Sequence, residues 1–219
     1  MKRFAVIGIG HFGSTVARTL FDAGAEVIVV DNDKDIIQDA TEFSTQAIHA
    51  DATEKRALQS LGLEDVDVAI VSLGERMDVI TLVALHLIEI GVPYTSVKAL
   101  SADHAKILKA IGVSDIIHPE EESAIRLATR LSLNNVIDFL PMISGYSVVS
   151  MLATPLAIGK RISDLETMDV QIVAIQHKES EKPTLIPHDE EIIKKGDVLI
   201  LIGENNEITK IAERYCEDI

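Results

Sequence analysis

Near its start the chain reads Phe4-Ala5-Val6-Ile7-Gly8-Ile9-Gly10-His11-Phe12-Gly13, a short apolar run that leads into a G-x-G-x-x-G loop. The apolar run has the composition of a buried strand, and a helical pattern follows at about residues 12–23. In such a loop Gly8 permits a tight turn, Gly10 lets the backbone approach a pyrophosphate, and Gly13 lets helix and strand pack closely. The following helix offers N–H groups and the positive end of its dipole to phosphates. The pattern therefore predicts a phosphate-binding loop.

Asp31 stands 18 residues after Gly13, at the end of the next apolar run. A carboxylate at this position accepts hydrogen bonds from ribose hydroxyls and repels a 2′-phosphate. We therefore expect an adenine nucleotide or NAD rather than NADP. Within the loop, His11 either contacts a phosphate oxygen or faces solvent, and the sequence leaves both alternatives open.

The first two-thirds of the chain alternates apolar runs with helical patterns. The runs are near-continuously apolar, as is typical of strands buried on both faces of a parallel sheet. Such an alternation predicts an α/β fold, a doubly wound parallel Rossmann-like sheet. Strands are expected at residues 4–7, 26–30, 45–48, 68–71, 94–97 and 115–117, and helices at 12–23, 34–40, 54–61, 76–90 and 102–111.

A different pattern follows the sixth predicted strand. A helix is expected from Pro119 to about Asn134, and the residues from there to Gly145 have the turn-forming composition of a linker. The remaining part predicts a smaller α+β domain, so that the domains are 1–137 and 138–219. Its strands are expected at residues 147–153, 170–176, 184–186 and 197–202, with a short helix at 162–165 and a last helix at 205–215.

Composition and charge limit the class of protein. Hydrophobic residues make up 47% of the 219 residues, as in globular proteins, and the net charge of −15 disfavours nucleic-acid binding. The one cysteine, Cys216, cannot form a disulfide framework and indicates a reducing compartment. The apolar runs are too short to span a bilayer, and the first strand leaves no room for a signal peptide. We therefore expect a cytoplasmic protein.

Polar residues follow the later predicted strands as well. The carboxyl ends of strands in an open α/β sheet border the ligand crevice, so these residues are candidates for the same site. Alternatives stay open: Asp51 as a cap of the next helix, Lys98 as a solvated strand end, and Glu120 as a first-turn acid. The candidates are Asp51-Ala52, Leu73-Gly74-Glu75, Lys98-Ala99-Leu100 and His118-Pro119-Glu120.

Several of these segments together resemble a known family. They are residues 4–13, Val71-Ser72-Leu73-Gly74-Glu75, Val97-Lys98-Ala99 and Ile116-Ile117-His118-Pro119-Glu120, followed by Gly159-Lys160-Arg161-Ile162 and Lys195-Gly196-Asp197-Val198-Leu199-Ile200. In this order they resemble an N-terminal RCK domain (regulator of potassium conductance) followed by a C-terminal RCK domain. The resemblance covers the whole chain and is closest to the Ktr-type gating subunit of bacterial potassium uptake, with the Trk type next.

The resemblance implies a function and partners. It implies a non-catalytic regulatory subunit that binds ATP or ADP and gates a membrane potassium-translocating subunit of the Ktr or Trk type. It also implies a homodimer that assembles into an octameric ring, peripherally associated with the inner face of the cell membrane. An NAD- or NADH-binding Trk-type regulator is the alternative.

The resemblance also assigns roles to residues of the candidate site. Asp31-Asn32-Asp33 would hold the ribose and Asp51-Ala52 would lie near the adenine, while residues 73–75, residues 98–100 and His104 would line the remaining wall. Glu120 would sit near the phosphates at the dimer interface, where family members can place a divalent cation.

Two departures from the family pattern carry expectations of their own. The family usually has an arginine that reaches the γ-phosphate where this chain has His11, and a neutral imidazole lacks its permanent charge and bidentate fork. We therefore expect weaker discrimination of ATP over ADP, or a preference for another adenine ligand. The C-terminal domain binds cyclic di-AMP in some relatives; Gln171-Ile172 replaces Asn-Ile there while Pro187 matches, which leaves that ligand possible but not predicted.

An NAD-dependent oxidoreductase is the second hypothesis, because the cofactor loop would look the same. It would need a proton donor near the nicotinamide, and the last part of the chain shows neither a paired His and Asp nor a Tyr-x-x-x-Lys motif. His49, His177 and His188 have no metal-ligand spacing. The sequence therefore favours a nucleotide sensor over an enzyme.

Overall fold

The computed structural model describes residues 2–133, 135–143, 145–165 and 169–214. The chain divides into two compact units, one up to Pro119 and one from Glu120 onward. The predicted domain boundary between residues 137 and 138 stays a prediction. Cys216, Asn134 and Tyr215, on which three of the expectations above fall, lie outside the described residues.

The first unit is built on a six-stranded sheet in which every pair of neighbouring strands is parallel. The strand order β3-β2-β1-β4-β5-β6 places β1 at the centre, with the chain running outward to each side in turn. This arrangement confirms the predicted doubly wound sheet. The strands are β1 (Arg3–Ile7), β2 (Glu26–Asp31), β3 (Gln46–His49), β4 (Val68–Val71), β5 (Thr95–Lys98) and β6 (Asp115–Ile117).

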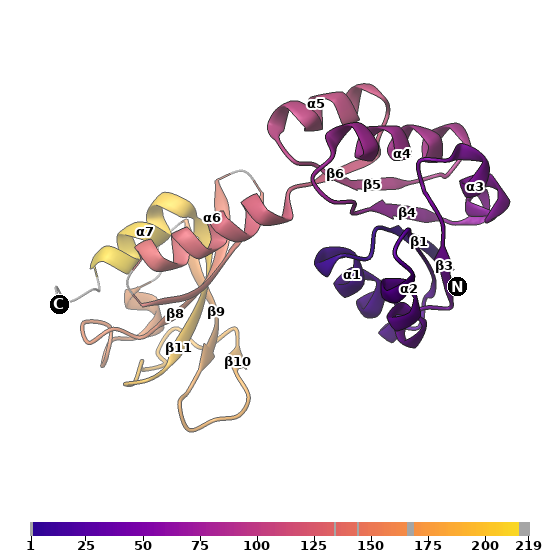
Figure 1. The fold of residues 1–219 in the computed structure, drawn as a ribbon. Helices are drawn as coiled ribbons and strands as arrows, with labels where there is room; N and C mark the ends of the chain where they lie inside the picture. Colours follow the sequence, from indigo (N-terminus) through magenta and orange to yellow (C-terminus); the bar gives the residue numbers. More distant parts are fainter. Residues whose placement is uncertain (1, 134, 144, 166–168, 215–219) are drawn as a thin grey trace. The chain divides into compact units, whose positions relative to one another are not determined.

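Helices cover both faces of this sheet (Figure 1). Side chains alternate between the faces along each strand, so Ile7 packs in one buried cluster and Val6 in the other. Ile7 shares its cluster with Leu58 and Leu87, whereas Val6 shares the opposite cluster with Ala17. The helices are α1 (His11–Asp22), α2 (Lys34–Ala40), α3 (Lys55–Ser60), α4 (Met77–Glu89) and α5 (Ala102–Ala110), with 3-10 turns at Thr41–Phe43 and Leu63–Asp65.

The second unit is an antiparallel sheet with helices, as expected for the smaller α+β domain. Its strand order is β10-β9-β11-β8-β7. Val149 of β8 and Leu199 of β11 are fully buried in its core, where Ile208 of the last helix joins them. Its elements are α6 (Pro119–Ser132), β7 (Val136–Pro141), β8 (Tyr146–Leu152), a 3-10 turn (Ile162–Asp164), β9 (Val170–Gln176), β10 (Thr184–Leu185), β11 (Val198–Glu204) and α7 (Asn205–Arg214).

One expectation about the second unit is wrong. The stretch after α6 was expected to be a linker, but it contains β7, which pairs antiparallel with β8 so that Phe139 lies opposite Val149. Pairing with β8 supplies the hydrogen bonds that make a strand of this stretch, although Pro141 and Gly145 mark its end as a turn.

Among the described residues, no helix combines the length and the apolar character needed to cross a membrane.

Candidate functional site

At two positions of the loop after β1, the packing permits only glycine. Gly8 has a φ of +89°, and a Cβ on it would stand 2.4 Å from the backbone oxygen of Ser72. A Cβ on Gly13 would stand 2.0 Å from the backbone oxygen of Gly8. Both distances are far inside van der Waals contact, so only glycine lets β1, β4 and α1 approach this closely.

Gly10 is different, because open space surrounds the place where its Cβ would be. Apart from Gly10 and its two neighbours in the chain, no described residue has an atom within 4 Å of that position. Gly10 is also the N-cap of α1, and as a glycine it makes no side-chain hydrogen bond to the backbone N–H groups there. The start of α1 thus has room and backbone N–H donors, with His11 exposed and Phe12 half-buried in the first turn.

Asp31 ties the end of β2 to this loop. Its Oδ2 accepts a hydrogen bond from the backbone N–H of Ile9 at 2.7 Å, and its Oδ1 accepts one from Asp33 at 3.0 Å. An ionised carboxylate can accept about four hydrogen bonds, so it retains acceptor capacity for ribose hydroxyls. Asp33 itself caps α2 through a hydrogen bond from the backbone N–H of Asp35 at 2.9 Å.

A cleft of about 750 Å³ opens at the carboxyl ends of the four strands β1–β4; Ile7, the residue before Gly8, lines it, whereas residues 8–13 of the glycine loop do not. Its volume lies within the range of small-molecule and cofactor sites. The structure brings many of the predicted residues together in its wall. They are Asp31, Asn32, Asp51, Ala52, Leu73, Gly74 and Glu75.

The first turns of α4 complete the wall, and the sequence analysis did not select them. Arg76 lines the cleft and forms an ion pair with Asp78, with 2.5 Å between guanidinium Nη2 and Oδ2. This pair raises the pKa of Arg76 and lowers the pKa of the Asp78 carboxyl. Val79 and Leu82 add apolar surface. The signal was available, because α4 begins directly after the selected residues 73–75 at the same sheet edge.

Asp51 does not cap the helix that follows it. The N-cap of α3 is Glu54, whereas Asp51 Oδ1 accepts hydrogen bonds from the backbone N–H of Thr53 at 2.9 Å and from its hydroxyl at 2.7 Å. The hydroxyl bond, with the backbone bond second, lowers the pKa of Asp51. The carboxylate is therefore ionised and exposed at the cleft wall.

His104 lies in the fully buried interior, close to the end of β5. Its Nδ1 accepts a hydrogen bond from the backbone N–H of Leu100 at 3.2 Å, so Nε2 carries the proton and faces Thr81 Oγ1 at 3.2 Å. Burial, with a smaller effect of His118, lowers its pKa and keeps the ring neutral. Both ring nitrogens are engaged within the protein, and His104 thereby holds the loop that contains Leu100.

The other predicted residues are not among those that line the cleft. Lys98 and Ala99 are at and just beyond the end of β5, and Leu100 follows them with an exposed side chain. Glu120 is in α6, in the second compact unit. No three His, Cys, Asp or Glu side chains among the described residues are grouped so that they could hold a metal ion. In β9 of the same unit Gln171 is exposed, while Pro187 is buried after β10.

Two family models match the chain, and together they span most of it. The TrkA-N domain matches residues 4–119, which is the first unit, and the TrkA-C domain matches residues 148–215. Among solved structures, the RCK domain of GsuK superposes on 100% of this chain with a TM-score of 0.67 at 15% identity, and the GsuK channel bound to NAD does so on 99% with 0.67 at 14%. The chain spans 48% and 40% of those two chains, and the likeness shows an RCK-like fold.

Curated proteins of similar sequence match over nearly their whole length. The Ktr system potassium uptake protein C of Bacillus subtilis is 35% identical over 97% of both chains. The Ktr system potassium uptake protein A is 35% identical in Bacillus subtilis, over 95% of both chains, and 31% identical in Vibrio alginolyticus, over 94% of both. This chain therefore belongs to the family of Ktr system potassium uptake proteins, with a TrkA-N domain followed by a TrkA-C domain.

Proposed function

We propose that this protein is the nucleotide-sensing subunit of a potassium uptake system, and that ATP or ADP in the cleft of the first unit gates a membrane potassium-translocating subunit. The names of its relatives support the potassium part of the proposal, since they are potassium uptake proteins rather than enzymes. The cleft supports the nucleotide part.

The observation that carries the nucleotide assignment is the space beside Gly10. The open Cβ position at Gly10 and the start of α1 follow β1, and Asp31, which is hydrogen-bonded to this loop, lines a cleft large enough for an adenine nucleotide. The open space suits a pyrophosphate, the N–H groups at the start of α1 suit its negative charge, and the carboxylate of Asp31 suits a ribose. The carboxylate also disfavours a 2′-phosphate.

NAD or NADH is the second candidate ligand, because a dinucleotide fits the same glycine loop and Asp31. One of the two superposed structures is the GsuK channel bound to NAD, which at 14% identity shares the fold with this chain. The two candidates differ in what lies beyond the pyrophosphate, a terminal phosphate or a nicotinamide ribose. Both candidate ligands would contact the site residues described above.

Calorimetric titration of the nucleotide-free protein with ATP, ADP, NAD⁺ and NADH separates the candidates. We expect ATP and ADP to bind without being hydrolysed and to displace each other. Binding of NAD⁺ and NADH alone would replace the proposed ligand, and turnover of a hydride acceptor with NADH would revive the oxidoreductase hypothesis. The Gly10→Ala protein is the matched control, because its added methyl enters the proposed pyrophosphate space and no other described part of the protein.

Gating requires that the nucleotide bind one conformation better than another. Reconstitution with the membrane subunit in potassium-loaded vesicles tests this part separately. We expect exchange of ADP for ATP to change the potassium flux. A flux that is the same in ATP, in ADP and without nucleotide would contradict gating even if the calorimetry shows tight binding.

The homodimer and its octameric ring are part of the same proposal. None of the residues of α6, all of which the structure describes, is buried, and Ile125 and Leu131 are 53% and 72% exposed. Such an apolar helix face suits a contact between subunits.

Glu120, at the start of this helix, is the proposed ligand of a divalent cation at that contact. Sedimentation of the protein with and without nucleotide and Mg²⁺ tests the ring and the cation together, with Glu120→Gln as the variant.

A further inference from the structure

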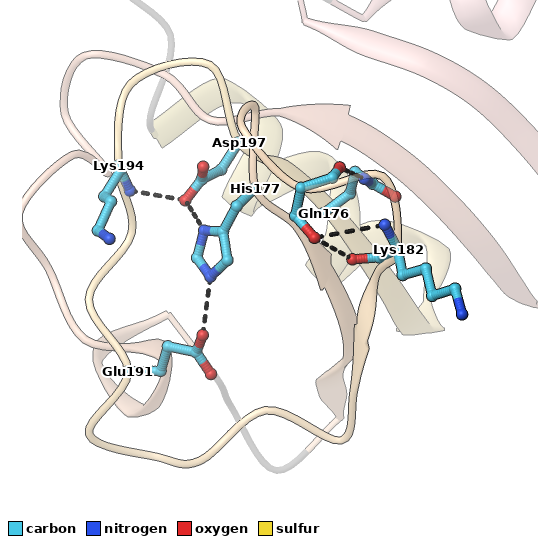
Figure 2. A network of polar contacts seen from close by, with 7 residues as sticks. Gln176, His177, Lys182, Glu191, Lys194 and Asp197 are labelled. Carbon is cyan, nitrogen blue, oxygen red and sulfur yellow. Dashed lines mark hydrogen bonds and ion pairs between the residues drawn. The ribbon is translucent and has the colours of Figure 1, made fainter.

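A histidine in the second unit is held between two carboxylates (Figure 2). His177 directly follows β9. Its Nδ1 lies 3.0 Å from Oδ2 of Asp197, and its Nε2 lies 2.9 Å from Oε1 of Glu191. The two carboxylates come from different places, Glu191 from the loop after β10 and Asp197 from the residue before β11.

One of the two carboxylates is deeply buried. Asp197 is 1% exposed, whereas the side chains of His177 and Glu191 are 25% and 23% exposed. Oδ2 of Asp197 also accepts a hydrogen bond from the backbone N–H of Lys194 at 2.8 Å. A buried carboxylate is costly unless it is paired and hydrogen-bonded, so Asp197 depends on these two donors.

The geometry requires a donor at both ring nitrogens, because ionised carboxylates only accept hydrogen bonds. A neutral imidazole has one N–H and an imidazolium has two. The hydrogen bond to Glu191 raises the pKa of His177 above its ordinary value, and Asp197 adds to this effect against the opposing effect of burial. When the ring loses its proton, one carboxylate faces a bare nitrogen and loses its hydrogen bond.

The other charged groups near the ring do not supply the hydrogen bond that is lost when His177 gives up its proton. Lys194 offers Asp197 its backbone N–H, and the methylenes of Lys178 lie beside Gly196, where a Cβ would meet Cδ at 2.9 Å. Glu190 faces Arg161, with 3.2 Å between Oε2 and Nη1. The groups that act on the charge of the ring are therefore the two carboxylates themselves.

The loop that carries Glu191 is joined to a further segment of the unit. The backbone oxygen of Glu191 accepts a hydrogen bond from Ile162 at 3.0 Å, and that of Ile193 accepts one from Gly159 at 2.8 Å. His177 thus connects the end of β9, the loop at residues 188–197 and, through that loop, residues 159–162.

We propose that His177, Glu191 and Asp197 form a pH-operated latch, which is closed while the histidine is protonated and opens when it loses its proton. The latch lies in the second unit and uses none of the residues that line the nucleotide cleft, so it gives the protein a second input. In the folded protein the pKa of His177 is above its ordinary value of about 6.5. The latch is therefore fully closed below pH 6.5, and it opens as the pH rises through the raised pKa of His177.

Hydrogen–deuterium exchange on the full chain tests the latch, with protection corrected for the intrinsic pH dependence of exchange. We expect protection of the Lys194 amide and its neighbours to fall about tenfold between pH 6 and pH 9, the loss expected for one charge-assisted hydrogen bond. In His177→Gln the same amides should show no pH step. His188→Gln is the matched control, because His188 is an exposed histidine of the same loop, and it should behave like the unaltered protein. A step that survives in His177→Gln, or that is absent from the unaltered protein, would overturn the proposal.

Nitrogen NMR of the histidine rings tests the latch in the unaltered protein, so this test does not depend on whether a variant folds. We expect His177 to titrate above its ordinary value and to carry protons on both nitrogens at pH 6. A ring that is neutral at pH 6 would also overturn the latch.

Discussion

The carboxylate of Asp31 and the backbone N–H of Ile9 are joined by a hydrogen bond of 2.7 Å, from the end of β2 to the middle of the glycine loop. The residue proposed to bind the ribose therefore also sets the position of the loop proposed to bind the phosphates. Binding of a sugar at Asp31 and binding of phosphates at residues 8–13 are mechanically linked through this one contact.

Replacement of Asp31 tests the link. In Asp31→Ala the N–H groups of Ile9 and Asp33 lose their acceptor, and we expect a loss of about 1–3 kcal/mol in the free energy of unfolding together with a loss of nucleotide binding. Urea denaturation and calorimetry measure the two effects. Asp31→Asn keeps one acceptor oxygen, so it should lose less stability than Asp31→Ala. Equal stability of both variants and the unaltered protein would contradict a structural role of the carboxylate.

The glycines of the loop should separate binding from folding. In Gly10→Ala the methyl enters open space, so we expect an unchanged thermal midpoint and a nucleotide affinity reduced at least about tenfold, since each such factor needs only 1.4 kcal/mol. In Gly13→Ala the methyl would stand 2.0 Å from the oxygen of Gly8, so the first unit should be strongly destabilised. Thermal unfolding and calorimetry of the two variants give the comparison. Unimpaired binding by folded Gly10→Ala would place the phosphates elsewhere.

His11 is exposed at the first position of α1, where a longer cation has room. His11→Arg adds a permanent charge with a bidentate fork, so we expect the ratio of ATP to ADP affinity to rise several-fold. His11→Gln, which has no charge, should leave the ratio near that of the unaltered protein at pH 8. An unaltered protein that already binds ATP far more tightly than ADP at that pH would refute the expected weak discrimination.

His104 should make the first unit sensitive to acid. Its pKa is lowered by burial, so the unfolded chain takes up a proton on this ring before the folded one does. Stability is therefore retained near neutral pH and declines as the pH falls below the ordinary value of about 6.5. Urea midpoints between pH 5 and pH 7.5 measure the decline, which should flatten in His104→Gln. His49→Gln is the control, since His49 is exposed. The stability contributed by His104 is lost as the pH falls, whereas the stability contributed by His177 is lost as the pH rises.

The first unit could be predicted almost element by element, because its strands are buried on both faces and its turns carry glycine. The expected strand at residues 68–71 and the expected helix at residues 34–40 agree with β4 and α2 to the residue. Most other bounds differ by a single residue, as helix and strand ends commonly do. Local patterns sufficed there because each one already agreed with the final packing.

The missed features depend on partners far away in the sequence. β7 becomes a strand because β8 pairs with it, and nothing within residues 136–141 states that pairing. His104 is hydrogen-bonded to Thr81, which lies 23 residues earlier in the chain. His177 likewise shows no local signal, since its carboxylates lie 14 and 20 residues further on. Such contacts appear only once the chain is folded.

The central strand of the second sheet is the last strand of the chain, and this order affects synthesis. A growing chain contains every strand of the first sheet once residue 117 has emerged, but the second sheet lacks β11 until residue 204. Until then β8 and β9 each present an unpaired edge and an apolar face, the surfaces on which partly made chains aggregate. A chain that ends before β11 therefore carries a complete first sheet attached to strands β8 and β9, whose facing edges are unpaired.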